Sequence, residues 1–138
     1  MTILVDSSVW IDFFRGDETR QTATLLRFLE GEWSSEPEPP EILVGDLVLC
    51  EVLRGVSDDA AYEQVKHYLS AFSNVTLATP RIAISSADHI RALRKLGITI
   101  RNTIDCLIAA WCIEHRIALL HNDRDFVPFQ DFRGLKVV

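Results

Sequence analysis

Cysteine, glycine, proline and basic side chains are all scarce in this sequence of 138 residues, and each shortage excludes a class of protein. The three cysteines, Cys50, Cys106 and Cys112, are scattered in apolar runs, so we expect small buried thiols in a reducing compartment and no disulfide framework. Six glycines and five prolines are too few for a collagen-like or low-complexity chain. The longest uncharged apolar run, residues 106–113, is far shorter than the roughly 18 residues of a membrane span. The N-terminus also lacks a basic stretch followed by a long apolar one, so we expect a cytoplasmic protein that does not enter a membrane.

The charge balance is acidic, with 14 Lys plus Arg against 20 Asp plus Glu and a net charge of −6. Because phosphate binding usually accompanies a basic surface, this balance alone favours a small-molecule enzyme or a protein-binding module over a nucleic-acid binder. A hydrophobic fraction of 48% is typical of an ordinary globular protein, and the length is close to that of the commonest domains. We therefore expect a single domain over residues 1–138.

Short apolar runs alternate with helical patterns along the chain. The strand-like runs are residues 3–5, 75–78, 117–120 and 135–138, and helical spacing is found at residues 22–29, 47–53, 59–72, 84–96 and 103–115. We expect Asp46 to be the N-cap of the second of these helices and Gly55 to lie at its end. This alternation predicts βαβ units, and hence an α/β domain with a mainly parallel central sheet covered by helices.

Residues 34–41 interrupt this pattern, because three of the four residues 37–40 are prolines. Proline removes a backbone donor and fixes φ, so the segment is expected to be neither a helix nor a central strand. An acidic surface loop is the plain interpretation, and a lid or a partner-contacting arm is the alternative.

Four acidic residues fall where solvation alone would not place them. Asp6 directly follows the first apolar run and Asp123 follows the third, so both belong at the carboxyl edge of a parallel sheet, where ligands bind. Glu51 lies on the apolar face of its predicted helix, and a buried carboxylate needs a partner. Asp105 is in the first turn of a helix so apolar that we expect it to lie in the core.

Each of these acids has a structural explanation when taken alone, since Asp is common in turns and at helix N-termini. Together they would repel one another unless a hard cation neutralised them, and Mg²⁺ or Mn²⁺ takes carboxylate oxygens, waters and substrate phosphates as ligands. Such a site can activate water and stabilise the leaving oxygen of a phosphodiester. The residues therefore predict a divalent-metal site for phosphoryl transfer.

Several neighbouring residues are candidates for supporting roles. Ser8 is placed to hydrogen-bond beside Asp6, since no nucleophile-elbow motif surrounds it. The basic residues Arg91, Arg94 and Lys95 have a solvated helix face as their default interpretation, although a phosphate backbone requires just such a strip beside an acidic site. Arg101 and Arg124 are the cations that we expect to approach the site and position the substrate. The cysteines and histidines of residues 106–121 lack zinc-site spacing.

Four blocks of the sequence, residues 3–11, 49–55, 103–110 and 120–126, resemble PIN-domain ribonuclease toxins of the VapC type. They span nearly the whole chain in the family's order. The resemblance implies a PIN-like three-layer α/β/α domain and an Mg²⁺- or Mn²⁺-dependent endoribonuclease that hydrolyses RNA. It further implies the toxin of a type II toxin-antitoxin system, blocked by a cognate antitoxin, with a homodimer and larger toxin-antitoxin complexes as its assemblies.

The resemblance also implies roles for individual residues. Asp6, Glu51, Asp105 and Asp123 match the family's acidic quartet, in which the first and third acids bind the metal directly and the other two bind it directly or through water. Ser8 matches a small polar position of the family, and Asp125 lies in the last block without an assigned role. The chain departs from compact members in residues 34–41, where substrate access or antitoxin contact would differ.

Two other functions remain open on the residues alone. A small metal-dependent phosphatase or phosphoacceptor domain also gathers acids at this sheet edge, although this sequence has no second acid two residues after Asp6. A non-catalytic scaffold, in which the acids only cap helices and turns, predicts that metal ions leave the melting temperature unchanged.

Overall fold

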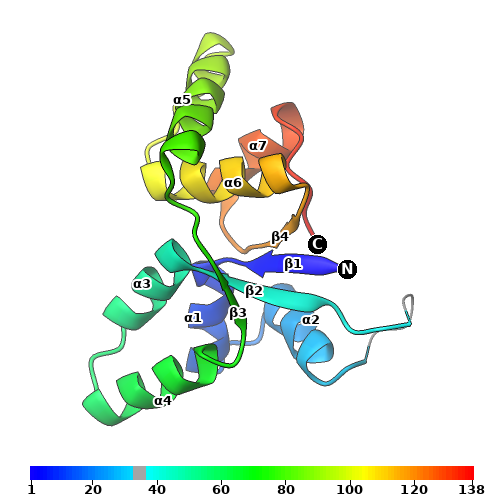
Figure 1. Cartoon of the computed structure of the whole chain (residues 1–138), viewed down its shortest axis with the longest axis vertical. Helices are drawn as coiled ribbons and strands as arrows, with labels where there is room; N and C mark the ends of the chain where they lie inside the picture. Colours follow the sequence, from blue (N-terminus) through cyan, green and yellow to red (C-terminus); the bar gives the residue numbers. More distant parts are fainter. Residues whose placement is uncertain (33–36) are drawn as a thin grey trace.

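A four-stranded, all-parallel sheet lies at the centre of the computed structural model, which describes residues 1–32 and 37–138 (Figure 1). The strands are β1 (Thr2–Val5), β2 (Glu41–Gly45), β3 (Ser73–Val75) and β4 (Ala118–Leu120), in the order β3-β2-β1-β4. Ile3, Leu4 and Val5 of β1 are completely buried, as expected for an inner strand covered on both faces.

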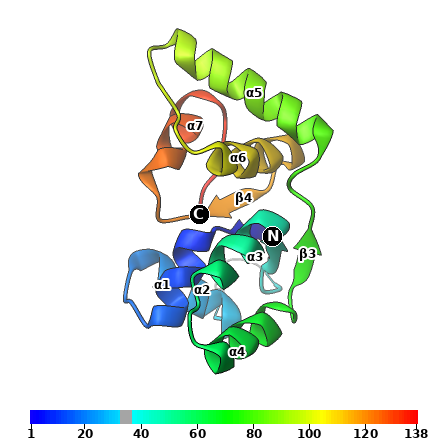
Figure 2. The same cartoon turned by 90° about the vertical axis from the view of Figure 1, so that its left-hand side faces the viewer.

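Helices cover both faces of the sheet. The described residues contain α1 (Ser7–Arg15), α2 (Arg20–Leu29), α3 (Asp46–Arg54), α4 (Asp59–Leu69), α5 (Pro80–Lys95), α6 (Thr103–His115) and α7 (Val127–Phe132). Figures 1 and 2 show α1 to α4 on one side and α5 to α7 on the other, with α5 outermost. The predicted three-layer α/β/α architecture is therefore confirmed. Within the described residues, no helix is long and apolar enough to cross a membrane.

Three predicted segments differ in the structure. Strand β2 (Glu41–Gly45) was not predicted, because its apolar run is short and lies between the proline-rich segment and the following helix. The strand expected at 75–78 is β3, an edge strand over Ser73–Val75, after which the chain leaves the sheet. The run at 135–138 forms only one bridge, from Val137 to Leu119.

The proline-rich segment is only partly described. Residues 33–36 lie outside the described part, so the loop predicted at 34–41 can be followed only from residue 37. Residues 37–40 are in no helix or strand, as expected, whereas Glu41 already belongs to β2.

The start of α3 also differs from the prediction. Gly45 is its N-cap, and Asp46 is its first residue. One Asp46 carboxylate oxygen accepts hydrogen bonds from the backbone N–H groups of Leu47 and Leu77, at 2.9 and 2.8 Å, so Asp46 joins α3 to the chain beyond β3. At Gly45 a Cβ atom would lie 2.2 Å from Cδ1 of Leu77, which explains why glycine is needed there. Gly55 follows α3 as predicted.

The cysteines divide into two kinds. Cys106 and Cys112 are buried on α6, as predicted, whereas Cys50 is exposed, because it lies on the outer face of α3. The prediction of three buried thiols was therefore wrong for Cys50.

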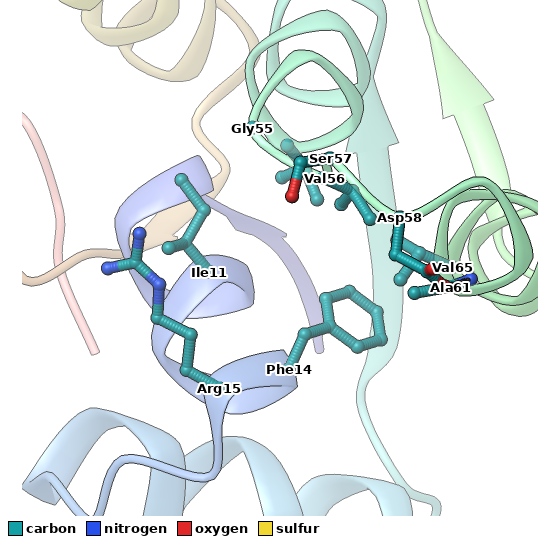
Figure 3. Close-up of a pocket in the computed structure, with 10 residues that line it drawn as sticks. Ile11, Phe14, Arg15, Gly55, Val56, Ser57, Asp58, Ala61 and Val65 are labelled. Carbon is teal, nitrogen blue, oxygen red and sulfur yellow. Dashed lines mark hydrogen bonds between the residues drawn. The ribbon is translucent and has the colours of Figure 1, made fainter.

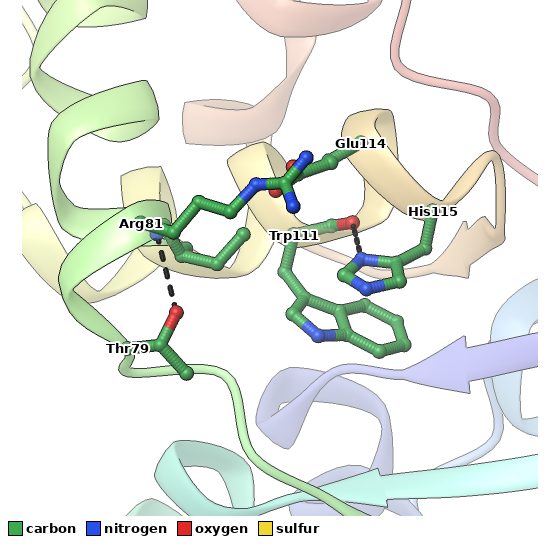
Figure 4. A network of polar contacts seen from close by, with 6 residues as sticks. Thr79, Arg81, Trp111, Glu114 and His115 are labelled. Carbon is green, nitrogen blue, oxygen red and sulfur yellow. Dashed lines mark hydrogen bonds and ion pairs between the residues drawn. The ribbon is translucent and has the colours of Figure 1, made fainter.

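Helix α6 is the rigid centre of its layer. Its residues Ile108, Ala109 and Cys112 are completely buried, which confirms the expected core position. An ion pair of 2.5 Å between Arg81, at the start of α5, and Glu114, near the end of α6, fastens the two helices together (Figure 4). Asp105 in the first turn of α6 is thus carried by a helix that is packed in the core.

Candidate metal centre

The parallel sheet brings the ends of the neighbouring strands β1 and β4 to one edge. Val5 pairs with Leu120, and the backbone N–H of Asp6 donates to the carbonyl of Leu120 at 2.9 Å. Figure 1 shows α3 and α6 beginning at the end of the sheet toward which β1 points. Residues that follow β1 and β4 therefore meet residues from the first turns of α6 and from α3.

Asp6 is a buried carboxylate with one satisfied oxygen. Its Oδ2 accepts hydrogen bonds from the backbone N–H of Ser8, at 3.0 Å, and from the Ser8 hydroxyl, at 2.6 Å, so Asp6 is the N-cap of α1. Its Oδ1 is buried and has no hydrogen-bond partner. Burial raises the pKa of Asp6, and the Ser8 hydrogen bonds oppose this rise. Capping therefore accounts for only one of its two oxygens.

Asp105 is also buried, with 3% of its surface exposed. Asn102 caps α6 by accepting the N–H of Ile104, so the capping role considered for Asp105 belongs to another residue. Its Oδ2 is buried without a partner. Burial, followed by the negative charges of Asp6 and Asp123, raises the pKa of Asp105 to about 7.

Glu51, a carboxylate on an apolar helix face, has a hydrogen-bond partner. The Ser7 hydroxyl donates to its Oε1 at 3.1 Å. Desolvation raises the pKa of Glu51, and the charge of Asp6 adds to the rise while that of Arg54 opposes it. Glu51 and Asp6 are therefore close enough to repel each other across the carboxyl edge.

Asp123 lies in a turn that is held by hydrogen bonds. Its Oδ1 accepts the backbone N–H of Asp125 at 2.9 Å, and its own N–H donates to Nδ1 of His121 at 3.2 Å. His121 Nε2 lies 2.9 Å from the amide oxygen of Gln130, so this nitrogen carries the proton. The supporting roles of His121 and Gln130 were not predicted, and no motif in the sequence indicates them.

Asp125 joins the cluster of acids. One carboxylate oxygen from each of Asp105, Asp123 and Asp125 lies within 4.8 Å of the others, a spacing that one metal ion could bridge. Asp6 is not in this group, but its charge contributes to the raised pKa of Asp105. The structure thus brings all four predicted acids to one edge and adds Asp125, whose role the sequence left open.

The donor set fits a hard divalent cation. All the clustered side chains offer carboxylate oxygens, the ligands that Mg²⁺ and Mn²⁺ prefer. The buried, unpartnered oxygens of Asp6 and Asp105 are unusual, because buried polar atoms in proteins nearly always have a partner. A cation at this edge would supply a partner that such an oxygen lacks and would reduce the repulsion among the acids.

The predicted supporting residues have different surroundings. Ser8 bonds Asp6 as expected, and its hydroxyl oxygen also accepts the backbone N–H of Asn122 at 3.0 Å, which connects α1 to the Asp123 turn. Arg101 and Arg124 are exposed, and neither forms an ion pair in the described part of the chain. Their proximity to a substrate therefore stays a prediction.

One apolar cavity is separate from the acids. It has a volume of about 320 Å³ and lies between α1, α3 and α4 (Figure 3). Ile11, Phe14 and Val52 are among the side chains that line it, and none of the four predicted acids does. This cavity is therefore not part of the acidic edge.

Comparison with known proteins gives matches over nearly the whole chain. The PIN domain family model matches residues 3–131. A VapC ribonuclease of Mycobacterium bovis and the ribonuclease VapC11 of Mycobacterium tuberculosis are each 28% identical to the chain over 124 residues, which is 90% of this chain and 88% of the relative.

Solved structures share the fold at low sequence identity. VapBC2 from Rickettsia felis, bound to a promoter DNA fragment, has a TM-score of 0.70 at 18% identity, covering 100% of this chain and 98% of that one. VapBC-1 from nontypeable Haemophilus influenzae has a TM-score of 0.71 at 15% identity, covering 100% and 97%. VapC20 of Mycobacterium tuberculosis, a toxin that cleaves the sarcin-ricin loop, has a TM-score of 0.63 at 14% identity, covering 91% and 92%.

Proposed function

Because this chain belongs to the PIN domain family, we propose that it is a metal-dependent endoribonuclease and the toxin of a type II toxin-antitoxin system. Curated relatives that cover 90% of the chain are named ribonucleases, and structural neighbours are toxin-antitoxin complexes. The observation that carries the proposal is the pair of buried, unpartnered carboxylate oxygens of Asp6 and Asp105 at the carboxyl edge of the sheet.

We assign the metal ion to the acidic cluster. Asp6 and Asp105 hold Mg²⁺ or Mn²⁺ directly, and Glu51 and Asp123 complete its surroundings, either as ligands or through water. A bound divalent ion supplies positive charge at the phosphate and a water molecule activated for attack. The short distances between the carboxylate oxygens of Asp105, Asp123 and Asp125 make Asp125 a further candidate ligand.

The remaining residues of the site hold these carboxylates in place and receive the substrate. Ser8 fixes one oxygen of Asp6 and leaves the other for the ion, and Ser7 does the same for Glu51. Arg101 and Arg124 are the cations that neutralise and position the phosphodiester. Hydrolysis at phosphorus does not need the 2′-hydroxyl group, so the preference for RNA rests on the relatives and not on the chemistry.

The assembly is proposed by analogy with the neighbours. A cognate antitoxin blocks the site, and the toxin forms a homodimer that enters larger toxin-antitoxin complexes. We place the single domain, residues 1–138, in the cytoplasm, where RNA is the available substrate. Light scattering of the chain with and without its antitoxin would measure the number of copies in each assembly.

The test is RNA cleavage by the chain purified without antitoxin. The wild type should cleave RNA with Mg²⁺ or Mn²⁺, and Asp6→Asn and Asp105→Asn should lose nearly all activity. Asp17→Asn, which removes an exposed acid on the loop after α1, is the matched control and should stay active. Wild-type rates in either site variant, or undiminished wild-type activity in EDTA, would refute the proposal. Release of phosphate from small esters without RNA cleavage would favour a phosphatase.

A further inference from the structure

One segment of this acidic protein carries only positive charge. Residues 89–104 contain Arg91, Arg94, Lys95 and Arg101 and no Asp or Glu, although the whole chain has a net charge of −6. The segment covers the second half of α5 and the connection to α6. The site described above uses only the last of these four cations.

Three of the cations form a single exposed group on α5. Arg91, Arg94 and Lys95 stand at positions i, i+3 and i+4, so they share one face of the helix. All three are exposed and together line a hollow of about 240 Å³. The ion pairs in the described part of the chain involve Lys66 and Arg81, so none of these three cations is in an ion pair there, and Asp88, one turn before Arg91, is the acid nearest to them in sequence.

Helix α5, which carries these three cations, packs against the core. The opposite face of α5 packs into the core through Ile82 and Leu93, which are almost completely buried. At its other end, α5 is fastened to α6 by the ion pair between Arg81 and Glu114 (Figure 4). The backbone that carries the three cations is therefore placed by core packing, and binding a phosphate chain would chiefly order their side chains.

The chain leads from this group directly to the acids. After α5 it turns at Gly97, whose φ of +80° favours glycine, and continues to Asn102, the N-cap of α6. Figure 2, which views the molecule from its carboxyl-edge side, shows this connection descending from the end of α5 to the start of α6. Arg101 is exposed on the connection, four residues before Asp105.

Helix electrostatics explain only part of this arrangement. Basic residues in a last turn stabilise the helix dipole, which accounts for Arg94 and Lys95. It accounts neither for Arg91, one turn earlier, nor for Arg101, which lies outside the helix. Nor does the helix dipole explain why residues 89–104, which extend beyond the helix, contain no Asp or Glu.

We propose that Arg91, Arg94 and Lys95 form, together with Arg101, a phosphate-binding strip that holds the RNA backbone beside the acidic metal centre. The proposal rests on the ribonuclease function proposed above. An RNA approaching a protein with a net charge of −6 needs local cations, and these four are the ones connected in sequence to Asp105. An acidic segment of a protein partner is the competing occupant that the test must separate.

The first experiment measures binding without cleavage. In an Asp105→Asn background, a fluorescein-labelled single-stranded RNA of 20 nucleotides is titrated by anisotropy at several salt concentrations. The triple variant Arg91→Gln, Arg94→Gln, Lys95→Gln should bind roughly 10–100-fold more weakly at 0.1 M salt, and its log-log salt slope should be smaller by about 2, at ~0.7 per lost phosphate contact. The matched control replaces Arg15, Arg20 and Arg27 with Gln. These exposed cations lie on α1 and α2, on the other side of the sheet, so RNA affinity and slope should stay unchanged.

The second experiment separates this inference from the ribonuclease proposal. With an active site of wild-type sequence, the triple variant should raise KM for RNA by a similar factor and leave kcat within about twofold. Equal RNA affinity and salt slope in the triple variant and the control would overturn the strip. So would loss of affinity for the antitoxin alone, which would assign the surface to a protein partner. A wild type that binds RNA through the strip but never cleaves it would refute the ribonuclease and leave the strip standing.

Discussion

Asp105→Asn should stabilise the metal-free protein while it removes activity. Asp105 is buried beside other acids, and its pKa is raised from the ordinary 3.8 to about 7. Folding therefore favours the protonated form, and the folded protein becomes less stable as the pH rises from about 4 to 7 and Asp105 ionises. Asparagine has a similar shape and no charge, so the variant escapes this loss.

The size of the effect follows from the shift in pKa. At 1.36 kcal/mol per pKa unit, the rise to about 7 corresponds to roughly 4 kcal/mol of lost stability above pH 7. The buried amide of asparagine leaves donors without partners, which costs about 1–3 kcal/mol. We expect a net gain of about 2 kcal/mol at pH 8, or roughly 7 °C in melting temperature for a chain of this length. The gain should shrink as the pH falls and change sign at about pH 5, where the smaller penalty for ionising Asp105 equals the cost of the buried amide.

The assay is thermal unfolding in EDTA at pH values from 4.5 to 8.5, with Asp17→Asn as the control for losing one exposed acid. The control should follow the wild type at every pH. If the Asp105→Asn variant is less stable than the wild type by the same amount at all pH values, the reasoning is refuted. Ionisation of the buried Asp105 carboxylate would then not destabilise the folded protein.

Three further predictions use the same site and its supports. Mn²⁺ should raise the melting temperature of the wild type by several degrees at 100 times its Kd and leave Asp6→Asn unchanged, and an equal rise in both would contradict a site at Asp6. Ser8→Ala should weaken Mn²⁺ binding about tenfold, since the Ser8 hydroxyl orients Asp6, and calorimetry that shows unchanged affinity would exclude this role. Gly45→Val should destabilise the fold by about 1–3 kcal/mol in urea unfolding, because its Cβ would meet Leu77, whereas Gly55→Ala, where φ is −85° and a Cβ would make only ordinary van der Waals contacts, should lose less.

Much of the fold could be predicted because it depends on local patterns. The apolar run of β1 and the long apolar helix α6 have the expected positions, and the resemblance drawn from four sequence blocks is confirmed by the family match. The order of the strands could not be predicted, because β2 is a short run beside the prolines. The last run, at 135–138, has strand-like composition, yet it makes only one bridge because tertiary pairing and not composition decides its structure.

The candidate site, like the fold, could be predicted only in part. Asp6 and Asp123 could be predicted to meet because parallel strands end at one edge, and the structure brings them together with Asp105 and Glu51. The hydrogen bond from Ser8 to Asp6 could also be predicted, but the partner of Glu51 could not, since Ser7 reaches it from 44 residues away. Nor could the sequence indicate that the N-cap of α6 is Asn102, which leaves the Asp105 carboxylate free for another role.

The central claim is that these carboxylates form a metal centre for RNA hydrolysis. The most direct measurement is the rate of cleavage of a single-stranded RNA as Mn²⁺ is titrated into the EDTA-treated, antitoxin-free wild type. The account predicts no cleavage at the start and a saturable rise that Asp105→Asn does not show. Full cleavage before any metal is added, or an equal rise in Asp105→Asn, would contradict it.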